Sequence, residues 1–287
     1  YITISMIVEI IYSAGGPRSD GIPAASSPGD IVVARPGRSQ VYAVLFERIY
    51  HEFVRNFRAR GLHIADSEFP LVAVVLPNQD RFVKYCQAEK SRVSSGVVGL
   101  YLTMSNRVAM FERANATEVD DVVIHEATHQ VAFNTGVHSR VATHPKWIVE
   151  GLATVFEADG VRSGGGKSPA DRLNLSRYRW FLEYEKSRRT KGSLEQIVRD
   201  DDMFSASTLD AYSEAWALSF YLIESRTAEY SRFLKRQAER DPLAPYDADA
   251  RYKDFTAAFG TDVERFEKSY LTFIRGYQTA LRLSGGR

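Results

Sequence analysis

The feature that most constrains this chain is the pentapeptide His125-Glu126-Ala127-Thr128-His129, which lies within an apolar stretch. Apolar residues on both sides of it, at mixed spacing, predict a buried helix. Residues four apart on a helix lie on the same face, so both imidazoles can reach one metal ion. Glu126 is rotated by about a hundred degrees from His125 and borders the metal without having to bind it. This arrangement is typical of a zinc hydrolase.

Two histidines do not complete a catalytic zinc site, which usually has three protein ligands and one open position. Glu150 follows His129 after 20 intervening residues, within the apolar sequence Trp147-Ile148-Val149-Glu150-Gly151-Leu152-Ala153. This sequence predicts a second buried helix. A carboxylate without a partner would be costly to bury there, and metal binding would remove that cost. Glu150 is therefore our candidate for the third ligand.

The two motifs together resemble the gluzincin branch of the zinc metallopeptidases, of which the thermolysin-like enzymes are familiar members. The resemblance implies that His125, His129 and Glu150 bind Zn2+ and that Glu126 is the general base. The sequence around Glu150 is more similar still to a bacterial group described only as peptidase-MA-like, whose function is unknown. The similarity covers roughly residues 41–276, weakly outside the motifs.

The metzincin pattern, a competing zinc-protease motif, does not fit this chain. That pattern requires glycine at Ala132 and histidine at Thr135. The alternative to a zinc site is a structural one, in which the two histidines form a buried pair that is hydrogen-bonded to its neighbours and binds no metal.

The gluzincin resemblance also implies a tyrosine or histidine that lies after the third ligand and steadies the transition state through a hydrogen bond. No histidine follows His144, so we expect a tyrosine. Tyr212, near the start of a predicted helix, is our first candidate. Tyr178 and Tyr221 are alternatives, and a core or surface role for Tyr212 stays open.

A further implication of the resemblance is an edge strand, beside the active-site helix, that pairs with extended substrate. Residues 97–104 and 107–111 predict a β-hairpin joined at Ser105-Asn106, and this hairpin is the candidate. Plain sheet scaffolding is the alternative. For a carboxylate or hydroxyl that orients a ligand histidine, the sequence offers Glu157 or Thr154.

Composition narrows the classes of partner. The formal net charge is +1, so there is no global argument for a nucleic acid or an anionic membrane. No stretch approaches the eighteen or so apolar residues of a transmembrane helix. The single cysteine, Cys86, excludes an intramolecular disulfide and is predicted to be a core residue. The family resemblance implies export, to the periplasm or outside the cell, and a chain beginning at Tyr1 fits a removed leader or a trimmed sequence.

Local patterns predict an α+β fold of two lobes. We expect a strand and connector over residues 1–40, a zincin-like lobe over residues 41–162, and a helical lobe over residues 163–287, with the zinc in a cleft between the lobes. The lobe boundary is placed at the glycine-rich stretch 160–169. Predicted local elements are a helix over 41–60, a strand over 71–76, a helix over 79–89 capped by Asn78, and helix starts at Thr117, Thr208 or Asp210, Thr227, Ala248 and Thr261.

The most specific function that these patterns support is hydrolysis of a peptide bond by a zinc-dependent metallopeptidase, with Glu126 as general base. Its substrate would be a peptide or protein. Two other readings stay open. One is a zinc-holding module that binds peptide without cleaving it, and the other is a zinc hydrolase of a non-peptide amide.

Overall fold

The computed structural model describes residues 32–33, 39–62, 64–112, 116–164 and 166–278. The strand and connector expected over residues 1–40 fall almost entirely outside this part of the chain. Within it, helices predominate and four strands form one mixed sheet, which confirms the predicted α+β class. None of the helices described is long and apolar enough to cross a membrane.

The chain divides into two compact units. Unit 1 comprises the chain up to His51 together with Ala65–Thr135, and unit 2 comprises Glu52–Ile64 and Gly136–Arg287. This division differs from the boundary expected near residue 163, because the helix that carries Glu150 packs on helices of unit 2.

Unit 1 contains the sheet and the helices that cover it. Its elements in chain order are β1 (Val32–Val33), the first part of α1 (Ser39–Ala59), β2 (Val72–Leu76), α2 (Gln79–Ala88), β3 (Gly99–Leu102), β4 (Arg107–Phe111) and α3 (Ala116–Asn134). The strand predicted over 71–76 and the hairpin predicted over 97–111 are both present, with bounds shifted by up to two residues.

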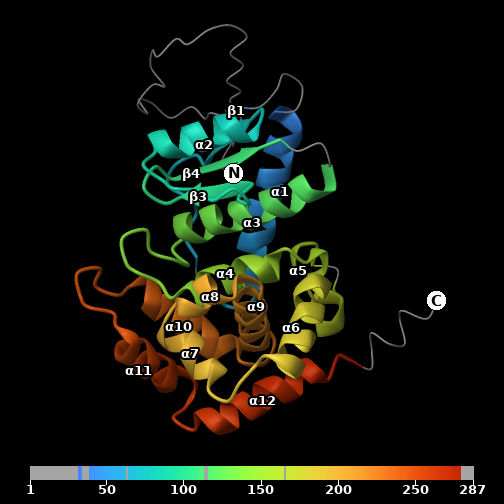
Figure 1. The fold of residues 1–287 in the computed structure, drawn as a ribbon, viewed down its shortest axis with the longest axis vertical. Helices are drawn as coiled ribbons and strands as arrows, with labels where there is room; N and C mark the ends of the chain where they lie inside the picture. The colour runs from blue at the N-terminus through green and yellow to red at the C-terminus, as the bar shows by residue number, and fades with distance from the viewer. Residues whose placement is uncertain (1–31, 34–38, 63, 113–115, 165, 279–287) are drawn as a thin grey trace, which may run out of the picture. The chain divides into compact units, whose positions relative to one another are not determined.

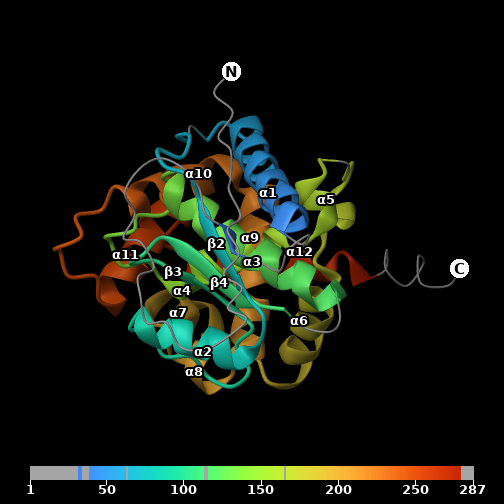
Figure 2. The ribbon, with the colours of Figure 1, turned by 90° about the horizontal axis from the view of Figure 1, so that it is seen from above.

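The strands lie in the order β1-β2-β4-β3, and β2, β4 and β3 are seen side by side in Figure 2. β2 is parallel to β1 and to β4, while β3 is antiparallel to β4. Asn106 closes the hairpin with a φ of 58°, a left-handed conformation that asparagine tolerates. β3 is therefore an edge strand of the described sheet, as the hairpin prediction requires.

Helices α2 and α3 cover opposite faces of the sheet (Figure 1). Alternation along β2 sends Val74 and Leu76 to the α2 face, where they pack with Phe82 and Cys86. Cys86 is fully buried, and burial raises the pKa of its thiol to about 11. The predicted core role of Cys86 is confirmed.

The helix ends test the predicted caps. The Asn78 side chain accepts a hydrogen bond from the Arg81 amide at 3.0 Å, as predicted. Gly136, with a φ of 78°, follows the end of α3. The prediction that Thr261 caps the last helix is wrong. The cap is Asp262, whose carboxylate accepts from the Arg265 amide. The side chain of Thr117 lies outside the described residues.

Unit 2 is helical in the described part. Its elements are the rest of α1, α4 (Lys146–Phe156), α5 (Asp159–Arg162), the 3-10 helix η1 (Pro169–Arg172), α6 (Leu175–Ser187), α7 (Ser193–Arg199), α8 (Asp202–Ala206), α9 (Thr208–Ser225), α10 (Thr227–Ala238), α11 (Ala248–Phe259) and α12 (Val263–Arg275). The predicted starts at Thr208, Thr227 and Ala248 are confirmed.

Helix α9 is the core of unit 2 (Figure 1). Helices α4, α6, α7, α8, α10 and α12 all pack against it. Every residue from Asp210 to Ile223 is buried except Tyr212. A helix that is buried on nearly all sides needs mostly apolar or small residues, and the α9 sequence supplies them. Its two buried carboxylates, Asp210 and Glu214, are paired with Arg188 and Arg189.

Candidate metal centre

Helix α3 places the two histidines as the sequence predicts. Their Nε2 atoms are 3.0 Å apart, and the two rings are nearly perpendicular, at 88°. Two nitrogens bound to one tetrahedral zinc at about 2.05 Å would be about 3.3 Å apart. The pair therefore needs only a small adjustment to hold such an ion. The same separation also suits a direct hydrogen bond between the rings, which is the arrangement of a metal-free pair.

Glu150 lies on α4, whose position in unit 2 is set by distant residues. The helix begins after Pro145, and the Asp201 carboxylate accepts a hydrogen bond from the Lys146 amide at 2.9 Å. A carboxylate at this end of a helix compensates the positive pole of the helix dipole. Asp201 is itself held by two hydrogen bonds from Arg251. The first turn of α4, which precedes Glu150, is thereby fixed.

The close contact between α4 and α9 depends on Gly151. A Cβ at this position would lie 2.3 Å from the Ser219 hydroxyl oxygen and 2.4 Å from the Ala215 carbonyl oxygen. The glycine next to Glu150 in the sequence motif is therefore required by helix packing. Trp147, Ile148 and Leu152 are fully buried on the same helix, as the apolar pattern predicts.

One potential ligand atom from each of His125, His129 and Glu150 lies within 4.8 Å of the other two. Two imidazole nitrogens and a carboxylate oxygen form a donor set that suits zinc. His129 is buried, and the other two side chains are partly buried. The described residues thus contain a His/Glu group that could hold a metal ion, made of the three predicted ligands.

Glu126 points from α3 toward the sheet and is 9% exposed. Its Oε2 accepts a hydrogen bond from the backbone N–H of Tyr101, on the edge strand β3, at 2.7 Å. Sequence reasoning missed this contact, because a backbone donor has no residue-type signature. The glycine that opens β3 is the one available signal, since an isolated glycine in a strand often marks a close backbone approach.

Tyr212 lies near the start of α9 and is partly exposed, within an otherwise buried stretch of the helix. The Phe204 ring meets its ring edge to face at 5.6 Å, and the Arg177 guanidinium lies 5.3 Å from its centre. These contacts fix the ring. Its assignment as the transition-state donor stays a prediction.

The side chains offered as supports for a ligand histidine have other partners. Glu157 Oε2 accepts from the Asn174 side chain at 2.7 Å and pairs with Arg177. The Thr154 hydroxyl donates to the Glu150 and Gly151 carbonyls of its own helix. Both contacts stabilise the structure around α4.

The segment before α4 contains two further histidines. His138 is 2% exposed, and its ring centre lies 5.2 Å from that of His144. Burial, aided by the Arg240 guanidinium, lowers the pKa of His144 to about 4. His144 is therefore neutral at physiological pH, and neither histidine of this segment is exposed.

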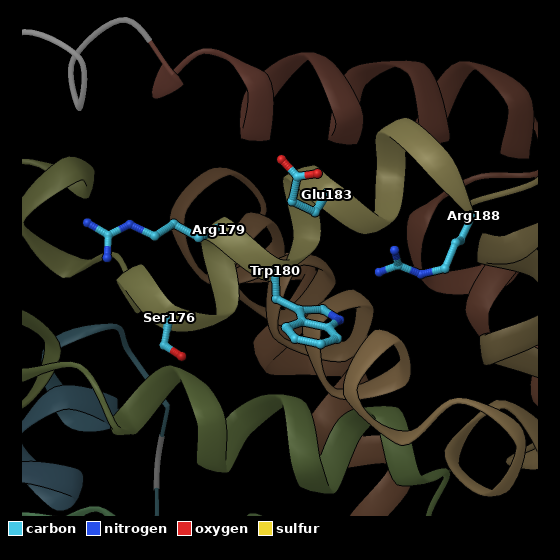
Figure 3. A pocket seen from close by; sticks show the side chains of 5 residues that line it. All are labelled: Ser176, Arg179, Trp180, Glu183 and Arg188. Carbon is cyan, nitrogen blue, oxygen red and sulfur yellow. The ribbon is translucent and has the colours of Figure 1, made fainter.

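A surface hollow of about 510 Å³ lies along α6 (Figure 3). The lining residues are Ser176, Arg179, Trp180, Glu183 and Arg188. Hydrogen bonds to Asp210 from the Arg188 guanidinium, the Ser207 hydroxyl and the Trp180 indole N–H lower the pKa of that carboxyl to about 2. Trp180 and Arg188 thus share Asp210 as a structural partner, and the hollow contains none of the candidate metal ligands.

Comparison with known proteins gives one match. Residues 119–244 match a family described as a protein of unknown function (DUF1570). The matched segment is less than half of the chain and includes His125, Glu126, His129 and Glu150. No curated protein and no solved structure matches the chain significantly.

Proposed function

We propose that this chain is a zinc-dependent hydrolase that cleaves peptide bonds. The observation that carries the proposal is the grouping of His125, His129 and Glu150, with ligand atoms within 4.8 Å of one another, beside a buried carboxylate on the same helix as the two histidines. Buried charged groups are costly unless they are paired or bind a metal. A metal-assisted hydrolase uses all four groups.

Each residue has a defined task in this proposal. The two histidine nitrogens and the Glu150 carboxylate would hold Zn2+. The ion would supply Lewis acidity and lower the pKa of a bound water toward about 7. Glu126 takes a proton from the attacking water on a carboxylate oxygen and passes it to the nitrogen of the leaving amine. Tyr212 donates its hydroxyl proton in a hydrogen bond to the substrate oxygen that becomes negative.

The first experiment compares metal content. Wild-type protein purified without exposure to a chelator should contain about one zinc ion per chain, as measured by elemental analysis. Glu150→Gln should lose most of this zinc, whereas Glu157→Gln, two turns later and just past the end of α4, should retain it. Equal zinc in the two variants would remove Glu150 from the ligand set. Wild-type protein that cannot be loaded with zinc would overturn the proposal.

The second experiment tests turnover with a library of quenched fluorescent peptides. Glu126→Gln keeps the shape of the side chain and removes the base, so hydrolysis should fall by several orders of magnitude while zinc is retained. A wild-type protein that binds zinc and peptide without cleavage would instead be a binding module. Cleavage confined to non-peptide amides would identify a hydrolase of a different substrate class.

A further inference from the structure

The Glu126 carboxylate is held by a backbone group of the edge strand. The register of β3 against β4 pairs Tyr101 with Val108, and the Phe111 amide donates to the Val98 carbonyl. In an antiparallel ladder the hydrogen-bonded pairs alternate, so the amides of Leu100 and Leu102 face β4. The Tyr101 amide therefore points away from β4, at the free edge of the sheet, where it meets Glu126 Oε2 at 2.7 Å.

Gly99 allows the strand to come this close. A Cβ there would lie 2.5 Å from Val122 Cγ1 and 3.2 Å from Glu126 Cγ. Both contacts are to side chains of α3, which lies next to β3 in unit 1 (Figure 1). Any larger residue would push the strand and the helix apart. The glycine thus brings the Tyr101 amide within hydrogen-bonding distance of the carboxylate.

The Tyr101 side chain keeps the strand in this register. Its hydroxyl donates to Asn106 Oδ1 at 2.8 Å, and its ring packs against Phe133 at 5.5 Å. Asn106 is bonded in turn to Asn134 of α3. The backbone amide and the side chain of one residue therefore connect the strand to two turns of the same helix.

From these contacts we propose that the Tyr101 backbone amide, brought close by Gly99, is a positioning group for Glu126. The proposal rests on the proposed function of Glu126 as a base. A carboxylate has about four lone-pair sites, so one N–H bond fixes its orientation and leaves capacity to accept a proton. A glutamate side chain is otherwise free to rotate, and holding it in one orientation reduces the entropy cost of reaching the reactive geometry.

The first test does not depend on activity. Hydrogen exchange of the Tyr101 amide is measured by NMR in the zinc-loaded protein. An amide at a free strand edge exchanges quickly unless it has a partner. We expect protection that falls about ten-fold or more in Glu126→Ala and is largely kept in Glu126→Gln, which retains an acceptor oxygen. Unchanged protection in Glu126→Ala would overturn the contact.

The second test removes the amide proton alone. Tyr101 is replaced by its α-hydroxy acid, which keeps the side chain and substitutes an ester oxygen for the N–H. We expect kcat for a fluorogenic peptide to fall about ten- to a hundred-fold, with KM and zinc content unchanged. The matched control is the same replacement at Leu100, whose amide faces β4, and it should retain kcat. An unchanged kcat in the Tyr101 ester would overturn the proposal.

The third test uses Gly99. Gly99→Ala should lower kcat and leave zinc content unchanged, because the new Cβ meets Val122 and moves the strand away from Glu126. Removing the obstructing atom in Gly99→Ala with Val122→Ala should restore most of the lost kcat. A double variant no better than Gly99→Ala, in a protein that still folds and binds zinc, would contradict the positioning role.

These tests separate the two proposals. If the wild-type protein binds zinc and hydrolyses nothing, the proposed function fails, and the exchange measurement still decides whether Tyr101 holds Glu126. If the wild-type protein is active and the Tyr101 ester is equally active, the function stands and the positioning role fails.

Discussion

Helices α3 and α4 carry the candidate ligands, and each is fixed within its own unit by a different kind of contact. α3 is tied to the sheet by polar side chains. Gln130, which is fully buried, donates to the carbonyls of Val72 and Asn106 at 2.9 and 3.0 Å. Glu126 accepts from the Tyr101 amide of β3. These bonds specify the position of the helix along the strands as well as its distance from them.

α4 is fixed by shape. Its contact with α9 is made by apolar side chains and by Gly151, which meets the backbone of α9 directly. Each helix thus depends on one glycine. The Cβ missing from Gly99 would meet the tip of a side chain, whereas the one missing from Gly151 would meet a carbonyl oxygen. A second substitution can remove a side-chain obstacle, but no substitution removes a backbone one.

The largest expected effect follows from this difference. Gly151→Ala should lower the free energy of unfolding of unit 2 by about 4 kcal/mol, because α4 must move away from α9 or strain its backbone. All three tryptophans of the chain, Trp147, Trp180 and Trp216, lie in unit 2, so their fluorescence during urea unfolding reports on this unit. Ser219→Gly in the same chain should give little rescue. Full recovery of the unfolding free energy would show that the Ser219 side chain, and not the Ala215 carbonyl, is the obstacle.

The next prediction concerns pH and the segment that leads into α4. Burial lowers the pKa of His144 to about 4, below the unfolded value of about 6.5. Between these values the unfolded chain binds more protons than the folded chain. The contribution of neutral His144 to the free energy of unfolding is therefore fully present above about pH 6.5 and is lost as the pH falls toward 4. The loss is about 3 kcal/mol. The measurement is the free energy of unfolding at pH 7 and at pH 4.5. His144→Gln should make the difference between the two values smaller by an amount comparable to this loss. An unchanged difference would show that His144 does not cause the pH dependence.

A third prediction addresses the transition-state donor on α9. Tyr212→Phe should lower kcat by roughly ten- to a thousand-fold and leave zinc content unchanged. The ring contacts with Phe204 and Arg177 survive the substitution, so the fold should be preserved. Tyr178→Phe is the comparison, because that residue is 1% exposed in the core. A larger loss of kcat in Tyr178→Phe than in Tyr212→Phe would identify Tyr178, and not Tyr212, as the transition-state donor.

The smallest expected effect tests the polar attachment of α3. Gln130→Ala leaves the partly buried carbonyls of Val72 and Asn106 without this donor, which should cost about 2 kcal/mol. Unit 1 contains no tryptophan in the described residues, so hydrogen exchange of the α3 and β2 amides is the suitable measurement. Tryptophan unfolding curves should not change. Faster exchange confined to unit 2 would contradict the assignment of this contact to unit 1.

The sequence alone determined the parts of this protein that depend on neighbouring residues. Helical periodicity placed His125 and His129 on one face of a buried helix, and the apolar surroundings of Glu150 identified the third candidate ligand. Alternation and turn residues predicted β2 and the hairpin, and Asn78 was recognised as a helix cap. These features follow from backbone geometry over a few residues, which residue types control directly.

The tertiary structure decided which distant groups meet. The partner of Glu126 is a backbone amide 25 residues earlier, and the carboxylate that caps α4 is Asp201, 55 residues after Lys146. Gly99 and Gly151 matter because other elements lie where their side chains would be. Such contacts depend on how the elements pack, and a backbone N–H or an absent Cβ leaves no pattern that distinguishes it along the chain.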